Sequence, residues 1–183
     1  MMQKQIIHFS YTSGGMLSYV EPQYETYAII ETFFFSVEWI QSTSNEAGSL
    51  YDRAIVAGYE GHDHSPLWVI RAHHKGDLIP GKLAVKHHAA YIPWDGKEHQ
   101  VHQFEVCCAR PELVRWVDNK KGNVPPNAVV GGHTAKGERL YIGRVNHERS
   151  LTPGKVHPSH NVMYIPYAGM EIPHENYQIL VST

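Results

Sequence analysis

The chain has 183 residues, of which 42% are hydrophobic and 19% charged, a composition too apolar for a disordered protein and too mixed for a coiled coil. This length is enough for one compact domain or two small ones without disulfides or metals to hold them together. The formal net charge of −2 excludes the strongly positive field that draws proteins to nucleic acid or anionic lipid. Nucleic acid is therefore not an expected partner.

Residues 1–35 have no counterpart elsewhere in the chain, and we expect an N-terminal extension that is either a strand or hairpin around the turn YTSGG or a remnant of another fused unit. The segment lacks the apolar stretch and small-residue cleavage site of a signal peptide. The longest apolar run, from Ala28 to Ile40, is interrupted by Glu31 and Glu38 and is shorter than the roughly 20 residues of a membrane helix. We therefore expect a cytoplasmic protein that does not insert into a membrane, and any release from the cell would be non-classical.

The remainder of the chain contains an internal repeat. Arg71–Cys107 aligns without a gap with Arg144–Leu180, 73 positions further on, and the shared blocks include Pro-Gly-Lys and Tyr-Ile-Pro. Upstream, the run AIVAG matches AVVGG at an offset one residue larger, so one loop has changed length. A fixed offset over this distance indicates a duplicated structural unit. We predict a first repeat at residues 36–108 and a second at residues 109–183.

Each repeat contains short segments rich in β-branched and aromatic residues, bounded by Gly, Pro and Asn, which is typical of strands. The first repeat has LWVIRAHH, AAYIPW and QFEVCCA, and the second has LYIGRVNH, VMYIPYA and NYQILV. Helical periodicity is not sustained, and the prolines would break a helix. The sequence predicts an all-β chain in which two tandem, pseudo-twofold-related repeats of short antiparallel strands form one β-sandwich-like unit.

The order and spacing of these motifs resemble the DM-nine repeat family, whose members carry the repeat in tandem in insects, molluscs and flatworms. The residues that carry the resemblance are AIVAGYE, GDLIPGK and AAYIPWDGKEH, with AVVGGHT, SLTPGK and MYIPYAGMEIPHE in the second copy. The resemblance implies a β-sandwich-like tandem pair. A mollusc member is a mannose-binding lectin without enzymatic activity, so the resemblance also implies a non-enzymatic lectin module, with a role in innate immunity.

The resemblance further implies ligand residues. In the mollusc lectin, a carboxylate after the AGY turn and the lysine of the PGK motif hold sugar hydroxyls, and the matching positions here are Glu60 and Lys82. The second repeat keeps the lysine as Lys155 but has Thr134 at the carboxylate position, which implies a weaker second site.

The chemistry of a sugar points to the same residue types independently. Hexose hydroxyls donate and accept hydrogen bonds together, so a site needs a carboxylate and an ammonium that converge on neighbouring oxygens. Tyr59 or Trp94 would cover the apolar sugar face, and Asp77 in the loop before the PGK motif is a further ligand candidate. The candidate ligand residues are therefore Glu60, Lys82, Asp77, Tyr59, Lys155 and Glu98.

Each of these residues also has a purely structural interpretation, and both stay open. The two PGK motifs are compatible with tight turns that leave the lysine solvated. Glu60 follows Gly58 and Tyr59 in a predicted loop, where an exposed carboxylate is ordinary. Glu98, which recurs as Glu171, would serve equally well as an acceptor for backbone N–H groups in a turn.

Metal and catalytic sites are not assigned. The 14 histidines suggest a metal, but few recur between the repeats, the pattern HExxH is absent, and His62-Asp63-His64 is a weak signal by itself. Cys107 and Cys108 are neighbours on a predicted strand, where an internal disulfide would be strained and thiols are usually inert. We therefore expect no enzyme activity, catalytic residue, metal or cofactor.

The leading hypothesis is a carbohydrate-binding module that recognises mannose-containing glycans. Shallow sugar sites bind weakly, so useful binding would require both repeats or a homodimer. The alternative, from a different functional class, is an intracellular interaction or scaffold protein in which the repeats are purely structural. A histidine-rich metal-binding protein is a third alternative.

Overall fold

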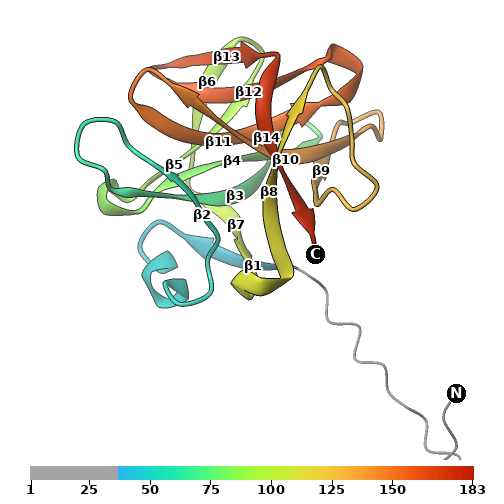
Figure 1. Cartoon of the computed structure of the whole chain (residues 1–183). Helices are drawn as coiled ribbons and strands as arrows, with labels where there is room; N and C mark the ends of the chain where they lie inside the picture. Colours follow the sequence, from blue (N-terminus) through green and yellow to red (C-terminus); the bar gives the residue numbers. More distant parts are fainter. Residues whose placement is uncertain (1–36) are drawn as a thin grey trace, which may run out of the picture. The chain divides into compact units, whose positions relative to one another are not determined.

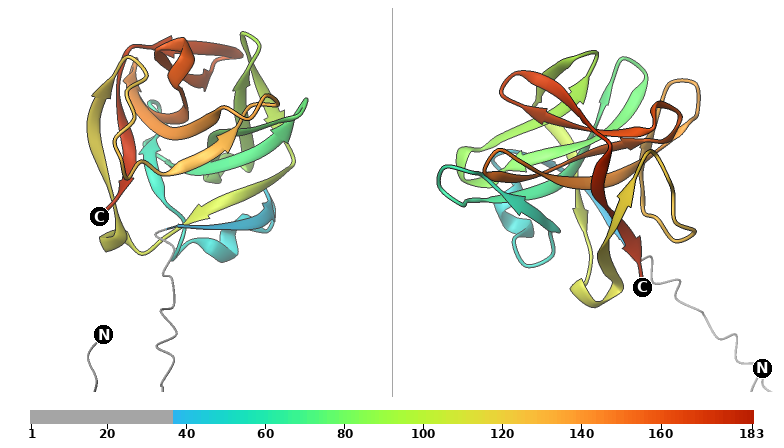
Figure 2. Two further views of the ribbon diagram at one scale, coloured as in Figure 1. Left: turned by 90° about the vertical axis from the view of Figure 1, so that its right-hand side faces the viewer. Right: turned by 45° about the horizontal axis from the view of Figure 1, so that its top comes forward.

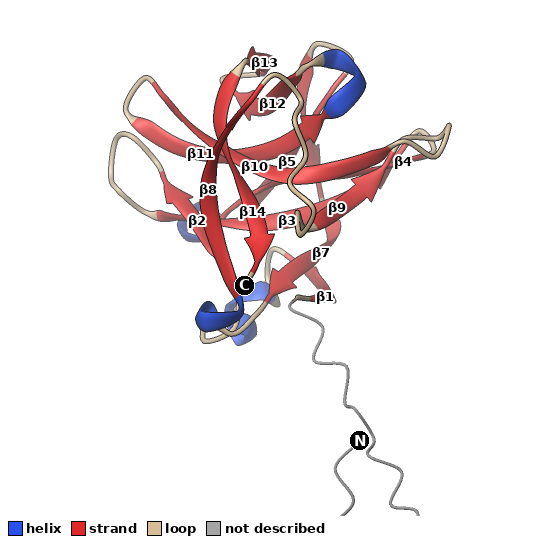
Figure 3. Ribbon diagram, turned by 45° about the vertical axis from the view of Figure 1, so that its right-hand side comes forward, coloured by secondary structure: helices blue, strands red, loops and turns tan. Residues whose placement is uncertain are grey.

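Fourteen strands and four short 3-10 helices make up residues 37–183, the part of the chain that this computed structural model describes (Figures 1 and 3). The first-repeat strands are β1 (Glu38–Thr43), β2 (Val56–Tyr59), β3 (Pro66–His74), β4 (Asp77–Ala84), β5 (Ala89–Trp94), β6 (Lys97–Val101) and β7 (Gln103–Cys108). The second-repeat strands are β8 (Val114–Lys120), β9 (Val130–His133), β10 (Arg139–His147), β11 (Ser150–His157), β12 (Val162–Tyr167), β13 (Met170–His174) and β14 (Asn176–Ser182).

The helices are η1 (Ala47–Leu50), η2 (Val85–His87), η3 (Pro111–Leu113) and η4 (Pro158–His160). Among the described residues, none of the helices has the length and apolar character needed to cross a membrane. The all-β prediction is confirmed. The predicted N-terminal extension, residues 1–35, lies outside the described residues, and the boundaries at 36–108 and 109–183 stay predictions.

All fourteen strands belong to one antiparallel sheet, in the order β1-β7-β3-β2-β11-β12-β13-β6-β5-β4-β9-β10-β14-β8. An additional pairing of β3 with β4 joins the ends of the segment from β3 to β4, so these eight strands form a closed barrel. The expected sandwich of two face-to-face sheets is not confirmed, because hydrogen bonding continues without a break from β1 to β8. Figure 2 shows strands of both repeats side by side in this body.

Strands of the two repeats pair with each other at two places, and a glycine lies at each of them. Strand β2 pairs with β11 of the second repeat through Tyr59 and Leu151, and β9 pairs with β4 of the first repeat through His133 and Leu78. A Cβ atom on Gly58 would lie 1.8 Å from the Leu151 carbonyl oxygen, and one on Gly132 would lie 1.9 Å from that of Leu78. The glycines shared by AIVAG and AVVGG therefore allow two backbones to approach closely.

The core is shared between the repeats in the same way. One buried cluster comes from the first repeat and is centred on Trp68, Ile70 and Ile92, and another comes from the second repeat around Met163 and Ile165. A third cluster combines side chains of both repeats: Ile55, Ala57, Val69, Cys107, Val129, Ile142 and Leu180. The repeats are therefore halves of one hydrophobic core.

Candidate functional site

The two PGK motifs lie inside strands. Pro80–Lys82 belongs to β4 and Pro153–Lys155 to β11, so the alternative of tight turns with solvated lysines is wrong. Lys82 is 5% exposed and Lys155 is 6% exposed. Burial of an ammonium is costly unless a partner of opposite charge is present.

Lys82 has such a partner, and both line an open pocket of about 530 Å³ between the two repeats. Its Nζ lies 3.1 Å from Oε1 of Glu98, whose side chain is 11% exposed. The same Nζ lies 5.5 Å from the ring centre of Tyr91 and 5.6 Å from that of Tyr167, within the range of cation–π attraction. The lysine is thus held between one carboxylate and two aromatic faces.

The pocket is lined by residues of both repeats. Its lining consists of Glu60, Lys82, Tyr91 and Glu98 from the first repeat and His147, Glu148, Tyr167, Ala168, Met170 and Ile172 from the second. The structure therefore brings Glu60, Lys82 and Glu98, three of the predicted ligand residues, into one pocket. A larger pocket of about 640 Å³, lined by residues of β8, β10, β11 and β14, contains none of them.

Glu98 has both of the roles that the sequence left open, as a pocket residue and as an acceptor for a backbone N–H group in a turn. One carboxylate oxygen faces Lys82, and the other accepts a hydrogen bond of 2.7 Å from the backbone N–H of Gly169, in the turn between β12 and β13. Glu98 therefore fixes a turn of the second repeat and also lines the pocket.

The two tyrosines remain protonated hydrogen-bond donors. Burial, followed by the negative charges of Glu98 and Glu60, raises the pKa of Tyr91. A hydrogen bond of 2.9 Å from the Tyr167 hydroxyl to Oε2 of Glu148 is the main cause of the raised pKa of Tyr167. The pocket thus offers one ammonium, neutral phenols and three carboxylates, beside the apolar side chains of Met170 and Ile172.

Asp77 and Tyr59 do not line this pocket. Asp77 accepts hydrogen bonds of 3.1 Å from Trp94 Nε1 and 2.6 Å from the backbone N–H of Ala135, so its carboxylate ties β4 to its neighbours. The Tyr59 ring lies against His64, with 5.5 Å between ring centres. Trp94, the other aromatic candidate, is held by this hydrogen bond to Asp77 and does not line the pocket either.

Sequence reasoning missed Tyr91, Tyr167, Glu148 and His147. The repetition of Tyr91 as Tyr164 in the YIP motif was a usable signal, because both rings face a buried lysine. The other three come from the second repeat, and no local pattern indicates that they line the same pocket as Lys82.

The equivalent lysine of the second repeat is engaged differently. Lys155 Nζ lies 2.8 Å from Oε1 of Glu171 and donates a second hydrogen bond of 2.8 Å to the carbonyl of Pro93. Thr134 stands where the first repeat has Glu60, and Trp94 stands where the second has Tyr167. Lys155 lines neither of the two pockets described above.

Two further groups bear on chemistry. Cys107 and Cys108 are free and buried in β7, and burial raises the pKa of both thiols, so they are poor nucleophiles. Among the described residues, one group places three metal-binding atoms within 4.8 Å of one another: His62, Asp63 and His87.

Comparison with known proteins identifies the family. A family model described as the DM9 repeat matches residues 61–174, more than half of the chain. The chain belongs to the DM9 repeat family. This confirms the resemblance stated from the motifs, and DM9 membership fits a lectin-like carbohydrate-binding module.

Two similar proteins extend the comparison. Natterin-1 from Thalassophryne nattereri is 28% identical over 108 residues, which cover 58% of this DM9 chain and 28% of Natterin-1. The chain thus spans well under half of the length of this relative. The nematode sperm cell motility protein MFP2B has a similar structure, with a TM-score of 0.52 at 10% identity, over 79% of this chain and 42% of that one. At this identity the likeness shows a shared fold alone.

Proposed function

We propose that this DM9 protein is a non-enzymatic lectin that binds mannose-type glycans in the pocket between its repeats. The observation that carries the proposal is the convergence of Lys82, Glu98 and Glu60 in one open pocket walled by Tyr91 and Tyr167. Its volume of about 530 Å³ falls in the range of roughly 300–1,000 Å³ typical of small-ligand sites.

The donors and acceptors of the pocket suit a sugar. An ammonium donates to neighbouring hydroxyl oxygens while carboxylates accept from the same hydroxyls, and Lys82, Glu98 and Glu60 supply both functions. Tyr91 and Tyr167 offer aromatic faces for the apolar side of the ring. Each hydrogen bond contributes only about 0.5–1.5 kcal/mol net, so we expect weak binding to a single sugar and propose that homodimers supply multivalency.

We also propose that the two repeats are related by an approximate twofold axis. Reciprocal contacts support it: Gly169 N–H donates to Glu98 and Gly96 N–H donates to Glu171, both at 2.7 Å. The backbone N–H groups of Glu98 and Glu171 donate in turn to the carbonyls of Gly169 and Gly96, both at 3.1 Å. When equivalent strands are exchanged, the strand order reads the same from either end.

The two repeats differ at positions around the buried lysine, and only Lys82 has the full set of pocket residues. Glu60 and Tyr167 belong to the pocket around Lys82, whereas Lys155 has Thr134 and Trp94 at the equivalent positions. We therefore place glycan binding at Lys82 alone and propose that Lys155, expected from sequence to be a weaker second site, serves only its ion pair with Glu171. A cytoplasmic protein acting in innate recognition of glycans, released by a non-classical route, is the biological role we propose.

Retention on mannose-agarose, with elution by free mannose, tests the function. We expect Lys82→Met and Glu60→Gln to weaken mannose binding by roughly tenfold or more, because hydrogen bonds to charged groups contribute about 1.5–3 kcal/mol. Lys155→Met is the matched control, since it breaks an equivalent buried ion pair without touching the pocket.

Two results would overturn the proposal. One is failure of the wild-type protein to bind any mannose-containing glycan on an array. The other is full binding by folded Lys82→Met and Glu60→Gln variants. Capture of protein partners that free sugar does not displace, together with either result, would favour the scaffold alternative.

A further inference from the structure

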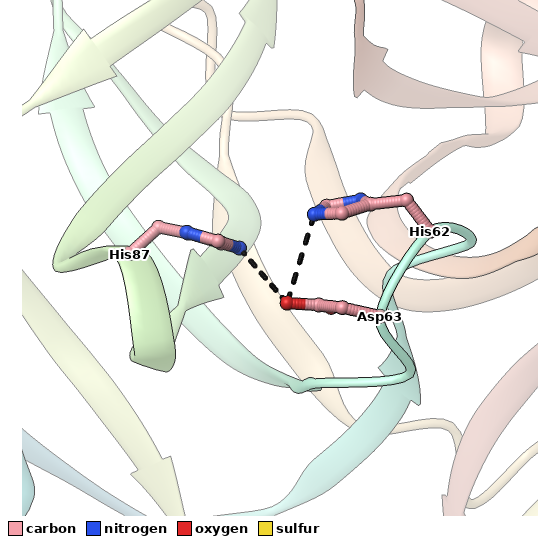
Figure 4. A group of neighbouring side chains, drawn as sticks. All are labelled: His62, Asp63 and His87. Carbon is pink, nitrogen blue, oxygen red and sulfur yellow. Dashed lines mark ion pairs between the residues drawn. The ribbon is translucent and has the colours of Figure 1, made fainter.

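The loop between β2 and β3 and the helix η2 bring two imidazoles close to one carboxylate, that of Asp63, three residues after Glu60. His62 and Asp63 belong to the loop, and His87 is the last residue of η2. Figure 4 shows both rings directed toward the Asp63 carboxylate. His62 Nε2 lies 3.6 Å from Asp63 Oδ2, and His87 Nε2 lies 3.4 Å from the same oxygen.

These separations match those of atoms that share a metal ion. Ligand atoms bound at about 2.0–2.2 Å in a tetrahedral zinc site lie roughly 3.3–3.6 Å from one another. The two measured distances fall within this range, and all three ligand atoms lie within 4.8 Å of one another. A small movement of the exposed imidazoles would equalise the three separations.

The carboxylate is held in position by the loop itself. Asp63 Oδ1 accepts a hydrogen bond of 2.9 Å from the backbone N–H of Ser65, which leaves Oδ2 directed toward the histidines. The loop is closed by hydrogen bonds of 2.9 Å from Glu60 N–H to the Ser65 carbonyl and 3.1 Å from His64 N–H to the Glu60 carbonyl. Outer hydrogen bonds of this kind orient metal ligands.

A cation already lies against this oxygen. Lys86 Nζ is 2.9 Å from Asp63 Oδ2, and its side chain is 61% exposed. The long, solvated lysine is free to turn away when a divalent ion takes its place. Lys86 would therefore compete with a metal.

In the second repeat, a loop carboxylate is attached to the equivalent helix η4 without two histidines on one oxygen. There, Glu138 accepts hydrogen bonds from the backbone and hydroxyl of Ser159 and contacts His157 Nε2. His160, the equivalent of His87, is directed to the Tyr164 hydroxyl at 3.1 Å. The carboxylate-to-helix contact is thus common to both repeats, whereas the pair of imidazoles on one carboxylate oxygen belongs to the first.

We propose that His62, Asp63 and His87 bind one divalent transition-metal ion of the zinc class through two imidazole Nε2 atoms and one carboxylate oxygen. Water would complete the coordination, because three protein ligands leave the fourth tetrahedral position open. The ion would fasten the β2–β3 loop to η2. This proposal departs from the expectation, drawn from sequence alone, that the chain has no metal ligand, and it does not depend on the proposed lectin activity.

Zinc titration of the untagged full-length chain, in competition with a chromogenic chelator, tests the site. We expect one Zn²⁺ per chain and a rise in Tm that EDTA reverses, since an ion that binds the folded state stabilises it. His62→Gln and His87→Gln should weaken zinc binding by more than the roughly 10–100-fold that follows loss of an outer partner. His160→Gln, at the equivalent position of the second repeat, should bind zinc like the wild type.

Lys86→Ala separates a metal site from a structural ion pair. Removal of the competing ammonium should tighten zinc binding, whereas an ion pair without metal predicts only a lower Tm. With Co²⁺ as the probe, the wild type should give the intense visible absorption of a four-coordinate ion, and His87→Gln should lose it. Absence of saturable zinc binding, or unchanged binding by both His62→Gln and His87→Gln, would overturn the proposal.

Discussion

At the scale of single residues, the main feature is a pair of equivalent buried Lys–Glu ion pairs, one in each repeat. Lys82 and Lys155 each face one carboxylate, and each carboxylate also accepts a backbone N–H from the opposite repeat. Removal of one partner of a buried pair typically costs about 3–5 kcal/mol, because the other charge is left uncompensated. A variant of Lys82 therefore alters stability as well as the pocket, whereas the equivalent variant of Lys155 alters stability alone.

Three histidines, of which His157 is buried and His74 and His174 are half-buried, predict how stability depends on pH. Burial is the main cause of the lowered pKa of His74, His157 and His174, and an Nε2 or Nδ1 atom in each ring is buried without a hydrogen-bond partner. In the unfolded chain these groups titrate near 6.5, so the unfolded state binds more protons just below that pH. The free energy of unfolding should be fully developed above about pH 6.5 and decrease as the pH falls.

Urea denaturation between pH 5 and 8 measures this dependence. His174→Gln should reduce the slope of the midpoint against pH, and the exposed His133→Gln should leave it unchanged. A midpoint that is constant, or that rises on acidification, would contradict the argument.

At the scale of elements, the PGK motif combines a packing requirement with a chemical one. A Cβ atom on Gly81 would lie 2.1 Å from the Tyr91 carbonyl oxygen in β5, and one on Gly154 would lie 2.0 Å from the equivalent oxygen of Tyr164. Only glycine allows the two backbones this approach. The next residue, Lys82, then pairs with Tyr91 in the strand register, which directs the ammonium to its aromatic neighbour.

Gly81→Ala should therefore lower the free energy of unfolding by about 3 kcal/mol or more, the upper end for overpacked sites. Gly48→Ala is the control, because a Cβ atom there meets nothing within 4 Å and the backbone has an ordinary conformation. Its effect should lie within about 0.5 kcal/mol. Chemical denaturation measures both, and equal stabilities would refute the packing explanation.

The limits of prediction from sequence follow from these contacts. Residue types and the repeat predicted an all-β chain. The family resemblance and the chemistry of a sugar named Glu60, Lys82 and Glu98 as candidates, since each is local to a motif. Pro-Gly is usual in turns. Here it lies inside β4 because the backbone of β5 passes close to Gly81, and no local pattern reveals that contact.

Long-range pairing explains the other differences. The continuous sheet arises because β2 and β9 pair across the repeats, and periodicity reports only which face of a strand is buried. Glu148 and Tyr167 reach the pocket through the same exchange. The contact of His87 with Asp63 likewise joins the β2–β3 loop to the helix η2, so the sequence His62-Asp63-His64 by itself could not indicate that the two residues meet.

At the scale of the whole molecule, the described residues 37–183 form one body made of two similar halves. Strand β2 lies between β3 and β11, and β4 contacts β9 as well as β3 and β5. The cluster around Val69 and Ile142 contains side chains of both repeats. Neither repeat has, within its own sequence, all the partners that its strands require.

Residues 36–108 and 109–183, produced separately, should therefore fail to unfold cooperatively, and an equimolar mixture should recover one transition. Near-ultraviolet circular dichroism and size-exclusion chromatography would follow assembly. The intact chain is the reference. Cooperative unfolding of either half alone would show that the repeats are independent domains.

The reciprocal hydrogen bonds between Glu98 and Gly169 and between Glu171 and Gly96 have an evolutionary consequence. A protein with only one repeat could form them only with a second chain, so its folded state would depend on concentration. Joining two copies in one polypeptide removes that dependence and lets each copy change separately. The exchange of Glu60 for Thr134 is the kind of divergence that gene duplication permits and that an obligate pair of identical chains forbids.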